Sequence, residues 1–124
     1  MILDSAEDFA EIIKNNWADR SVSVSKTVPA QDIRIKIQNA RILAWKEMNR
    51  TIREKHSPDT VFLVITGTAI ASGANKENKT RMLIIAIEGD TVYDVRDTRL
   101  VVLTPKEVVE LRPADGHQIT EEVH

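Results

Sequence analysis

The chain has 124 residues, no cysteine, and 17 basic against 19 acidic side chains, which give a formal net charge of −2. This length is typical of one domain with one hydrophobic core, and the lack of cysteine excludes disulfides, thiolate metal sites and a thiol nucleophile. No apolar run approaches the ~18 residues of a membrane span, and the N-terminus lacks a signal-peptide pattern, so we expect a soluble cytoplasmic protein.

The first predicted element is an amphipathic helix over residues 5–19, with Ser5 as its N-terminal cap. Its apolar side chains recur at helical spacing: Phe9, Ile12, Ile13 and Trp17. Residues 21–28 then alternate valine with serine, which predicts a half-buried strand.

Residues 29–56 allow two interpretations. In the first, they form one long helix that starts near Pro29, with an apolar stripe at steps of three and four: Ile33, Ile37, Ala40, Ala44 and Met48. In the second, residues 33–37 form a strand that pairs back on residues 21–28, and a helix begins only near Asn39. We favour the first because Ala40 and Ala44 continue the stripe without a break.

Four more strands are predicted after the turn signal at His56–Asp59: residues 61–72, 80–87, 91–96 and 100–104. Gly67 marks a bulge within the first of these strands, and residues 73–79 form a hairpin loop. The unbroken apolar run in residues 80–87 predicts a central strand covered on both faces. A short helix follows, Lys106 to Leu111.

The predicted fold class is α+β, in two layers: a four- to five-stranded antiparallel meander sheet packed against a long helix and an N-terminal helix. Residues 1–112 form a single domain, and residues 113–124 form a flexible acidic tail. This element order is similar to the cone-shaped fold of nuclear transport factor-like proteins, in which a curved sheet wraps a long helix and can enclose a pocket.

Charge is unevenly distributed along the chain. Residues 33–56 hold 7 basic and 2 acidic side chains, a net charge of +5. On a helix these basic side chains form a solvated face, but they also allow an alternative function, the recognition of phosphate in a nucleotide or nucleic acid. The phosphate-binding candidates are Lys76, Lys79, Arg81, Arg96, Arg99, Lys46, Arg50 and Arg53.

An apolar patch lies on the opposite side of the predicted long helix from its main stripe. Its members are Ile35, Ile42, Leu43 and Trp45. Exposed apolar groups of this size are typical of a contact with another protein. The favoured function is therefore a non-enzymatic binding, assembly or inhibitor-like accessory protein that acts as a homo-oligomer, or with another protein partner, through its long central helix.

No pattern predicts catalysis, a metal site or a cofactor. Residues 67–76 lack the lysine spacing of a phosphate loop, and the three histidines are not at ligand spacing. The acids between Glu88 and Asp97 have arginine neighbours that can pair with them, and Tyr93 is expected to pack. A further alternative is a small enzyme or ligand carrier with a pocket in a cone-shaped sheet.

Overall fold

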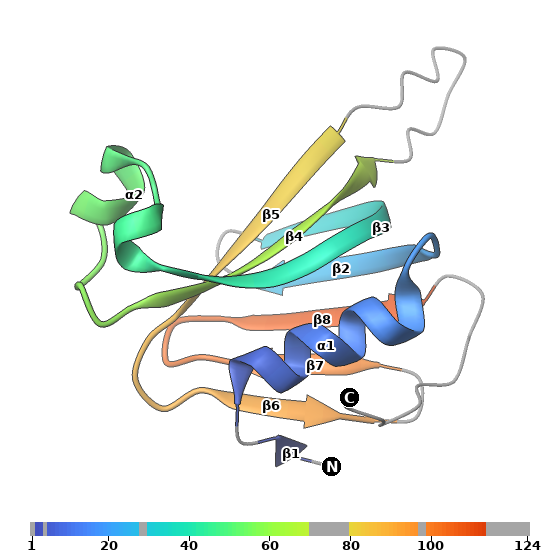
Figure 1. Cartoon of the computed structure of the whole chain (residues 1–124). Helices are drawn as coiled ribbons and strands as arrows, with labels where there is room; N and C mark the ends of the chain where they lie inside the picture. Colours follow the sequence, from blue (N-terminus) through green and yellow to red (C-terminus); the bar gives the residue numbers. More distant parts are fainter. Residues whose placement is uncertain (1, 4, 28–29, 70–79, 97–98, 114–124) are drawn as a thin grey trace.

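The computed structural model of the chain describes residues 2–3, 5–27, 30–69, 80–96 and 99–113. These residues form one eight-stranded antiparallel sheet with two short α-helices and one 3₁₀ turn, η1 (Figure 1). In chain order the elements are β1 (Ile2–Leu3), α1 (Ala6–Trp17), β2 (Ser21–Thr27), β3 (Ala30–Ala44), η1 (Trp45–Glu47), α2 (Arg50–Glu54), β4 (Val61–Ala69), β5 (Thr80–Ile87), β6 (Val92–Val95), β7 (Leu100–Leu103) and β8 (Val108–Pro113).

The expected long helix over residues 29–56 is wrong, and with it the two-layer α+β fold. Residues 30–44 form β3, a 15-residue strand that pairs with β2 and places Val22 opposite Ile35. The second interpretation is therefore correct for residues 33–37, but its helix from Asn39 is also wrong. The longest helix in the described part of the chain has 12 residues, so the long helix implied by the similarity to nuclear transport factor-like proteins is missing there too.

A β-bulge explains why β3 resembles a helix in sequence. The register with β4 shifts between Ile37 and Asn39, so Gln38 is an extra residue. Ile35 and Ile37 point inward before the bulge, and Ala40 points inward after it. The inward positions therefore change from steps of two to one step of three, which imitates helical spacing.

Gly67 lies opposite this bulge, on β4. A β-carbon at Gly67 would lie 2.2 Å from the Lys36 carbonyl oxygen and 2.7 Å from Ile35 Cγ1. The strands can approach this closely only because residue 67 has no side chain. The predicted bulge within the strand of Gly67 is therefore wrong: the extra residue lies in β3, and Gly67 lies opposite it.

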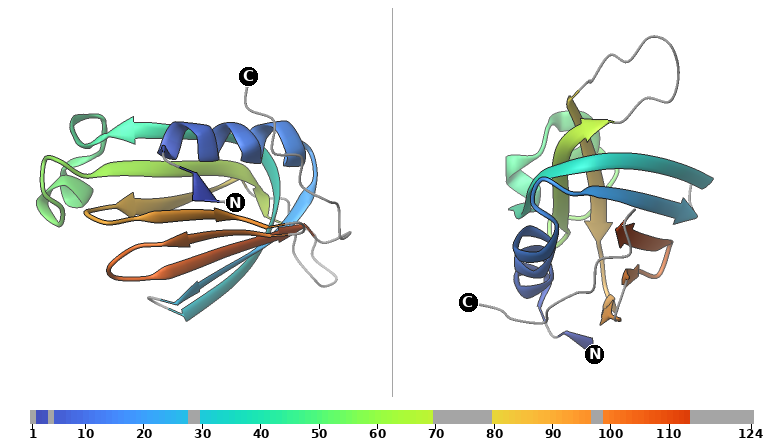
Figure 2. Two further views of the ribbon diagram at one scale, coloured as in Figure 1. Left: turned by 90° about the horizontal axis from the view of Figure 1, so that it is seen from below. Right: turned by 90° about the vertical axis from the view of Figure 1, so that its right-hand side faces the viewer.

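The sheet is strongly curled. Its strand order is β1-β6-β7-β8-β2-β3-β4-β5, so β5 and β6 are six neighbour steps apart, about 29 Å in a flat sheet. The chain between them, residues 88–91, spans at most roughly 18 Å. The sheet must therefore bend to bring these two strands together, as Figure 2 shows.

The predicted central strand, β5, is an edge strand. It pairs only with β4 in the described sheet, and its second half alternates between buried and half-buried positions. Its apolar run arises because each face meets a different apolar cluster. Leu83, Ile85 and Ile87 join the main core, whereas Ile84 and Ala86 pack on the outer side.

The main core lies inside the curl. The N-terminal helix is confirmed: α1 is capped by Ser5, whose Oγ accepts a 3.1 Å hydrogen bond from the Asp8 amide. Its buried side chains pack against inward side chains of β2 to β8, and Phe9 meets Tyr93 with ring centroids 5.3 Å apart. A single apolar cluster therefore contains side chains of α1, of β6 near one end of the sheet and of β5 at the other end.

A second apolar cluster covers the outer face at one end of β3, β4 and β5. Its buried members are Met48, Phe62 and Val64, with Leu43, Trp45, Ile52, Ile84 and Ala86 packed against them. The turn η1 and helix α2 thus act as a lid on this part of the sheet (Figure 1).

The expected helix over residues 106–111 is also wrong. Val109 and Leu111 alternate inward on β8, which pairs with β7 and β2. Six residues are too few to separate a period of two from a period of 3.6 by sequence alone. Of the predicted tail, Pro113 ends β8, and residues 114–124 lie outside the described residues.

Candidate functional site

A cavity of about 220 Å³ lies between the β2–β3 pair and β5, and we call it the edge cavity. Its lining residues are Val24, Lys26, Ile33, Ile35, Arg81, Met82, Leu83 and Ile84. Val24, Ile35 and Leu83 belong to the main core, so the cavity reaches the inner face of the curled sheet. Six of its eight lining residues are apolar, and the other two are cations.

Two cations border these apolar walls. Lys26 lies two positions beyond Val24 on β2, and Arg81 lies two positions before Leu83 on β5, so each shares the inner face of its strand. Lys26 Nζ lies 3.8 Å from Glu107 Oε2, and both side chains are largely buried, with 12% and 11% exposed. Arg81 is exposed and has no acidic partner among the residues that the structure describes.

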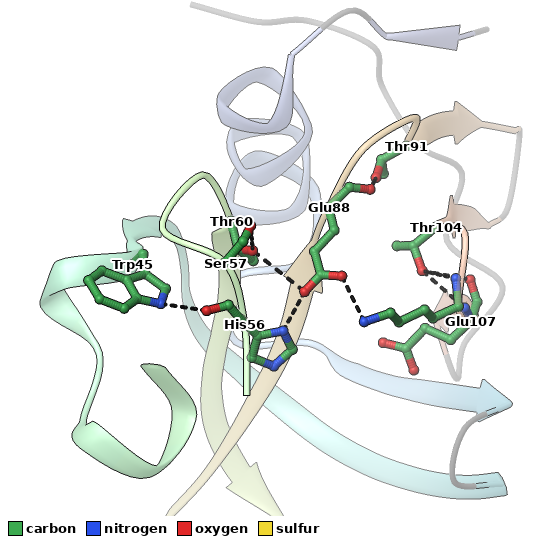
Figure 3. A network of polar contacts seen from close by, with 9 residues as sticks. Trp45, His56, Ser57, Thr60, Glu88, Thr91, Thr104 and Glu107 are labelled. Carbon is green, nitrogen blue, oxygen red and sulfur yellow. Dashed lines mark hydrogen bonds and ion pairs between the residues drawn. The ribbon is translucent and has the colours of Figure 1, made fainter. Parts of the chain in front are cut away.

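A polar network lies at the other end of β5, centred on Glu88 (Figure 3). Lys106 Nζ lies 2.9 Å from Glu88 Oε2, and His56 Nδ1 donates to Oε1. The Thr60 hydroxyl donates to the same oxygen at 3.5 Å. Because Lys106 belongs to the β7–β8 turn and His56 to the connection before β4, Glu88 ties three segments together.

The indole of Trp45 supports this network from the second apolar cluster. Its Nε1 donates to the carbonyl of His56 at 3.0 Å and to that of Arg53 at 3.1 Å. The His56 ring also meets Phe62 edge to face, with centroids 5.4 Å apart. His56 is thus held through both its backbone and its ring.

The hydrogen bond from His56, and next that from Lys106, lower the pKa of Glu88 below its usual value of 4.5, and partial burial opposes them. At neutral pH Glu88 is therefore an ionised acceptor and not a proton donor. A second cavity, about 170 Å³, lies beside it and is lined by His56, Ala86, Glu88 and residues 104–107. The described residues contain no group of three acids or histidines that could hold a metal ion. The network is best explained as a clamp between β5 and the β7–β8 turn.

The four predicted partner-binding residues do not share a surface. Ile35 is 1% exposed and lines the edge cavity from the core, and Ile42 packs against the same core. Leu43 and Trp45 pack in the second cluster, on the outer face. Neighbouring residues of a strand point to opposite faces, so the apolar patch of the expected helix is divided between two cores.

The predicted phosphate-binding residues do not converge either. Lys76 and Lys79 lie outside the described residues. Arg96 binds Asp94 at 2.9 Å, Arg99 lies 3.6 Å from Glu110, and Arg50 binds Glu54 at 2.7 Å.

The rest of this set lies on separate elements. Arg53 lies over the Trp45 ring at 5.8 Å, and Lys46 is exposed on η1. Of the members of this set that the structure describes, Arg81 lines the edge cavity. Tyr93, expected to pack, is 6% exposed, and burial raises its pKa to about 12.

Four residues of these sites were not among the predicted site residues: Lys26, His56, Glu88 and Lys106. Lys26 follows Val22 and Val24 at a period of two, so this pattern could have placed it on the inner face. The contact between His56 and Glu88 spans 32 positions and depends on the pairing of β4 with β5, so no local pattern reports it.

Comparison with protein-family models, with curated proteins and with solved structures gives no match. None of the helices in the described part of the chain is long and apolar enough to cross a membrane.

Proposed function

We propose that this protein binds a small amphipathic anion in the edge cavity: a carboxylate with a short apolar chain. The observation that supports this most directly is Arg81, a cation beside apolar walls and without an acidic partner among the described residues. An apolar cavity with a few polar groups at its rim is the usual form of a small-ligand site. A guanidinium can bind both oxygens of a carboxylate at once.

Arg81 is a better anchor than Lys26. The charge of Lys26 is already balanced by Glu107, and bringing a second anion beside this largely buried pair would be unfavourable. Arg81 is exposed, so a ligand can reach it from solvent while its apolar chain enters the cavity. We therefore place the carboxylate at Arg81 and the chain against Val24, Ile35 and Leu83.

The cavity volume limits the ligand. The volume of about 220 Å³ is that of roughly seven waters in the liquid. Hexanoate is of this size, and longer chains would have to extend into solvent. Each buried methylene contributes about 0.8 kcal/mol, and a hydrogen bond to a charged group about 1.5–3 kcal/mol.

The test is a titration of the protein with hexanoate, butanoate and hexanol, followed by the NMR shifts of backbone amides. Two methylenes are worth ~1.6 kcal/mol, so butanoate should bind about 15-fold more weakly than hexanoate. Arg81→Gln should weaken hexanoate binding about 10-fold or more and change hexanol binding little. The largest shifts should come from β2, β3 and β5 around the edge cavity.

The matched control is Arg34→Gln, which removes one exposed cation from the outer face of β3. It should leave the affinity for hexanoate unchanged. Equal losses in the two variants would mean that only net charge matters, and the proposal would then be wrong. Binding that does not depend on chain length would equally exclude the cavity as the site.

A further inference from the structure

The outer edge of β5 is open. Its eight residues pair on one side with β4 and on the other side with no described strand. In an antiparallel sheet, half of the backbone groups of such a strand point away from its neighbour and can pair with another strand. The opposite edge of the sheet is β1, which has only two residues.

Natural edge strands usually carry lysine, proline or a bulge that blocks pairing. β5 contains no lysine and no proline, and its register with β4 shows no bulge. Arg81 is its only charged residue. Met82 is 57% exposed, among the most exposed large apolar side chains of the described chain. Arg81, which points to the inner face, is the one charge on this strand that opposes pairing, and residues 82–87 carry none.

The accessible part of the edge is its first half. Near the end of β5, Glu88 binds Lys106 of the β7–β8 turn, and the cavity that this turn lines reaches Ala86. Residues 80–82 are all exposed, and burial begins only at Leu83. The free stretch is thus residues 80–84, with Met82 at its centre.

We propose that two copies of this chain associate through antiparallel pairing of their β5 edges, with a twofold axis at Met82. In this register Met82 lies opposite Met82 of the partner subunit, Thr80 opposite the partner's Ile84, and Arg81 opposite the partner's Leu83. Each arginine thus faces an apolar residue, and no like charges lie directly opposite one another. Residues 81–84 of this edge also line the edge cavity, so a partner strand here and the proposed ligand would compete for the same side of β5.

A second copy fits this edge better than a foreign strand. β5 offers no charge pattern that would select another sequence, whereas twofold pairing needs only the strand itself. On the outer face, Met82 and Ile84 border the second apolar cluster, to which Ile84 already belongs. Pairing would extend this apolar layer into the partner and cover Met82.

Single-cysteine crosslinking tests the register, because the natural chain has no cysteine. Met82→Cys places two thiols directly opposite each other, within reach of a disulfide. Thr80→Cys lies on the same exposed stretch, but the register separates the two thiols by four positions. Leu103→Cys, at a side chain that is 40% exposed on β7, controls for random collision.

Under mild oxidation, Met82→Cys should form disulfide dimers at least tenfold faster than either control, as measured by non-reducing electrophoresis. Sedimentation of the wild-type chain should give a mass that rises with concentration, and Met82→Lys should remain a folded monomer. Equal crosslinking of Met82→Cys and Thr80→Cys would overturn the register. Identical monomeric sedimentation of the wild type and Met82→Lys at all concentrations would overturn the dimer.

Discussion

Replacing Gly67 by alanine should destabilise the protein because this glycine is buried against the bulge of β3. The added β-carbon would lie 2.2 Å from the Lys36 carbonyl oxygen, a backbone atom that cannot rotate away. Overpacking typically costs about 1–3 kcal/mol, and alanine recovers about 0.4–1 kcal/mol by restricting the unfolded chain. Taking the upper part of the first range, we expect a net loss of about 2 kcal/mol in the free energy of unfolding.

Urea unfolding followed by circular dichroism measures this loss. With a slope of about 1.5 kcal/mol per M, the midpoint should fall by about 1.3 M. Gly89→Ala is the control: Gly89 has φ of 57° but its nearest new contact would be 3.7 Å away, so its cost is conformational only, about 1 kcal/mol.

The same substitution should also affect the edge cavity, because the new β-carbon lies 2.7 Å from Ile35 Cγ1, in the wall of that cavity. We expect weaker hexanoate binding in Gly67→Ala and none of this effect in Gly89→Ala. A Gly67→Ala protein as stable as the wild type would refute the close approach of β3 and β4 at the bulge.

Two further substitutions test the clamp around Glu88. The folded-state pKa of Glu88 is lowered from 4.5, so its carboxylate stabilises the fold above about pH 4.5 and this contribution is lost as pH falls through the lowered pKa. At pH 6 the free energy of unfolding should therefore be larger for the wild type than for Glu88→Gln, and this difference should shrink by pH 3. A difference that stays constant with pH would contradict the role of the ionised carboxylate. Trp45→Phe removes the indole donor to the carbonyls of Arg53 and His56. It should lower the free energy of unfolding, measured in urea, by about 1–2 kcal/mol and should speed amide exchange in α2. Unchanged amide exchange in α2 would show that the indole does not hold this helix.

The elements that sequence reasoning predicted correctly are those whose pattern is uninterrupted. α1 has a capping serine and apolar side chains at one helical spacing, and β2 alternates serine and valine from Ser21 to Ser25. In both cases the local period and the burial in the fold agree. The strands β4, β6 and β7 were found for the same reason; the ends of β6 and β7 were predicted within one residue, and residues 70–72 of the strand predicted at β4 lie outside the described residues.

The candidate site was predicted only in part. Arg81 was singled out, but for phosphate and as part of a set that the fold disperses. The edge cavity depends on the curl that leaves β5 beside β2 and β3, and the curl depends on the strand order. Strand order is a property of pairings between distant segments, so a pattern within one segment cannot report it.

The bulge in β3 connects the wrong prediction of a helix over residues 30–44 with the edge cavity that was not predicted. One extra residue, Gln38, keeps both Ile37 and Ala40 on the inner face, and this makes a strand imitate a helix in sequence. The residue that permits the bulge is Gly67, on the next strand and about thirty positions away. A helix over residues 33–44 would have needed no such glycine, whereas this bulged strand leaves no room for a side chain at residue 67. Without the bulge, Ile42 would point outward, away from the main core that it now packs against. The strand β3 could then no longer contribute Ile42 to the main core and Leu43 to the second apolar cluster.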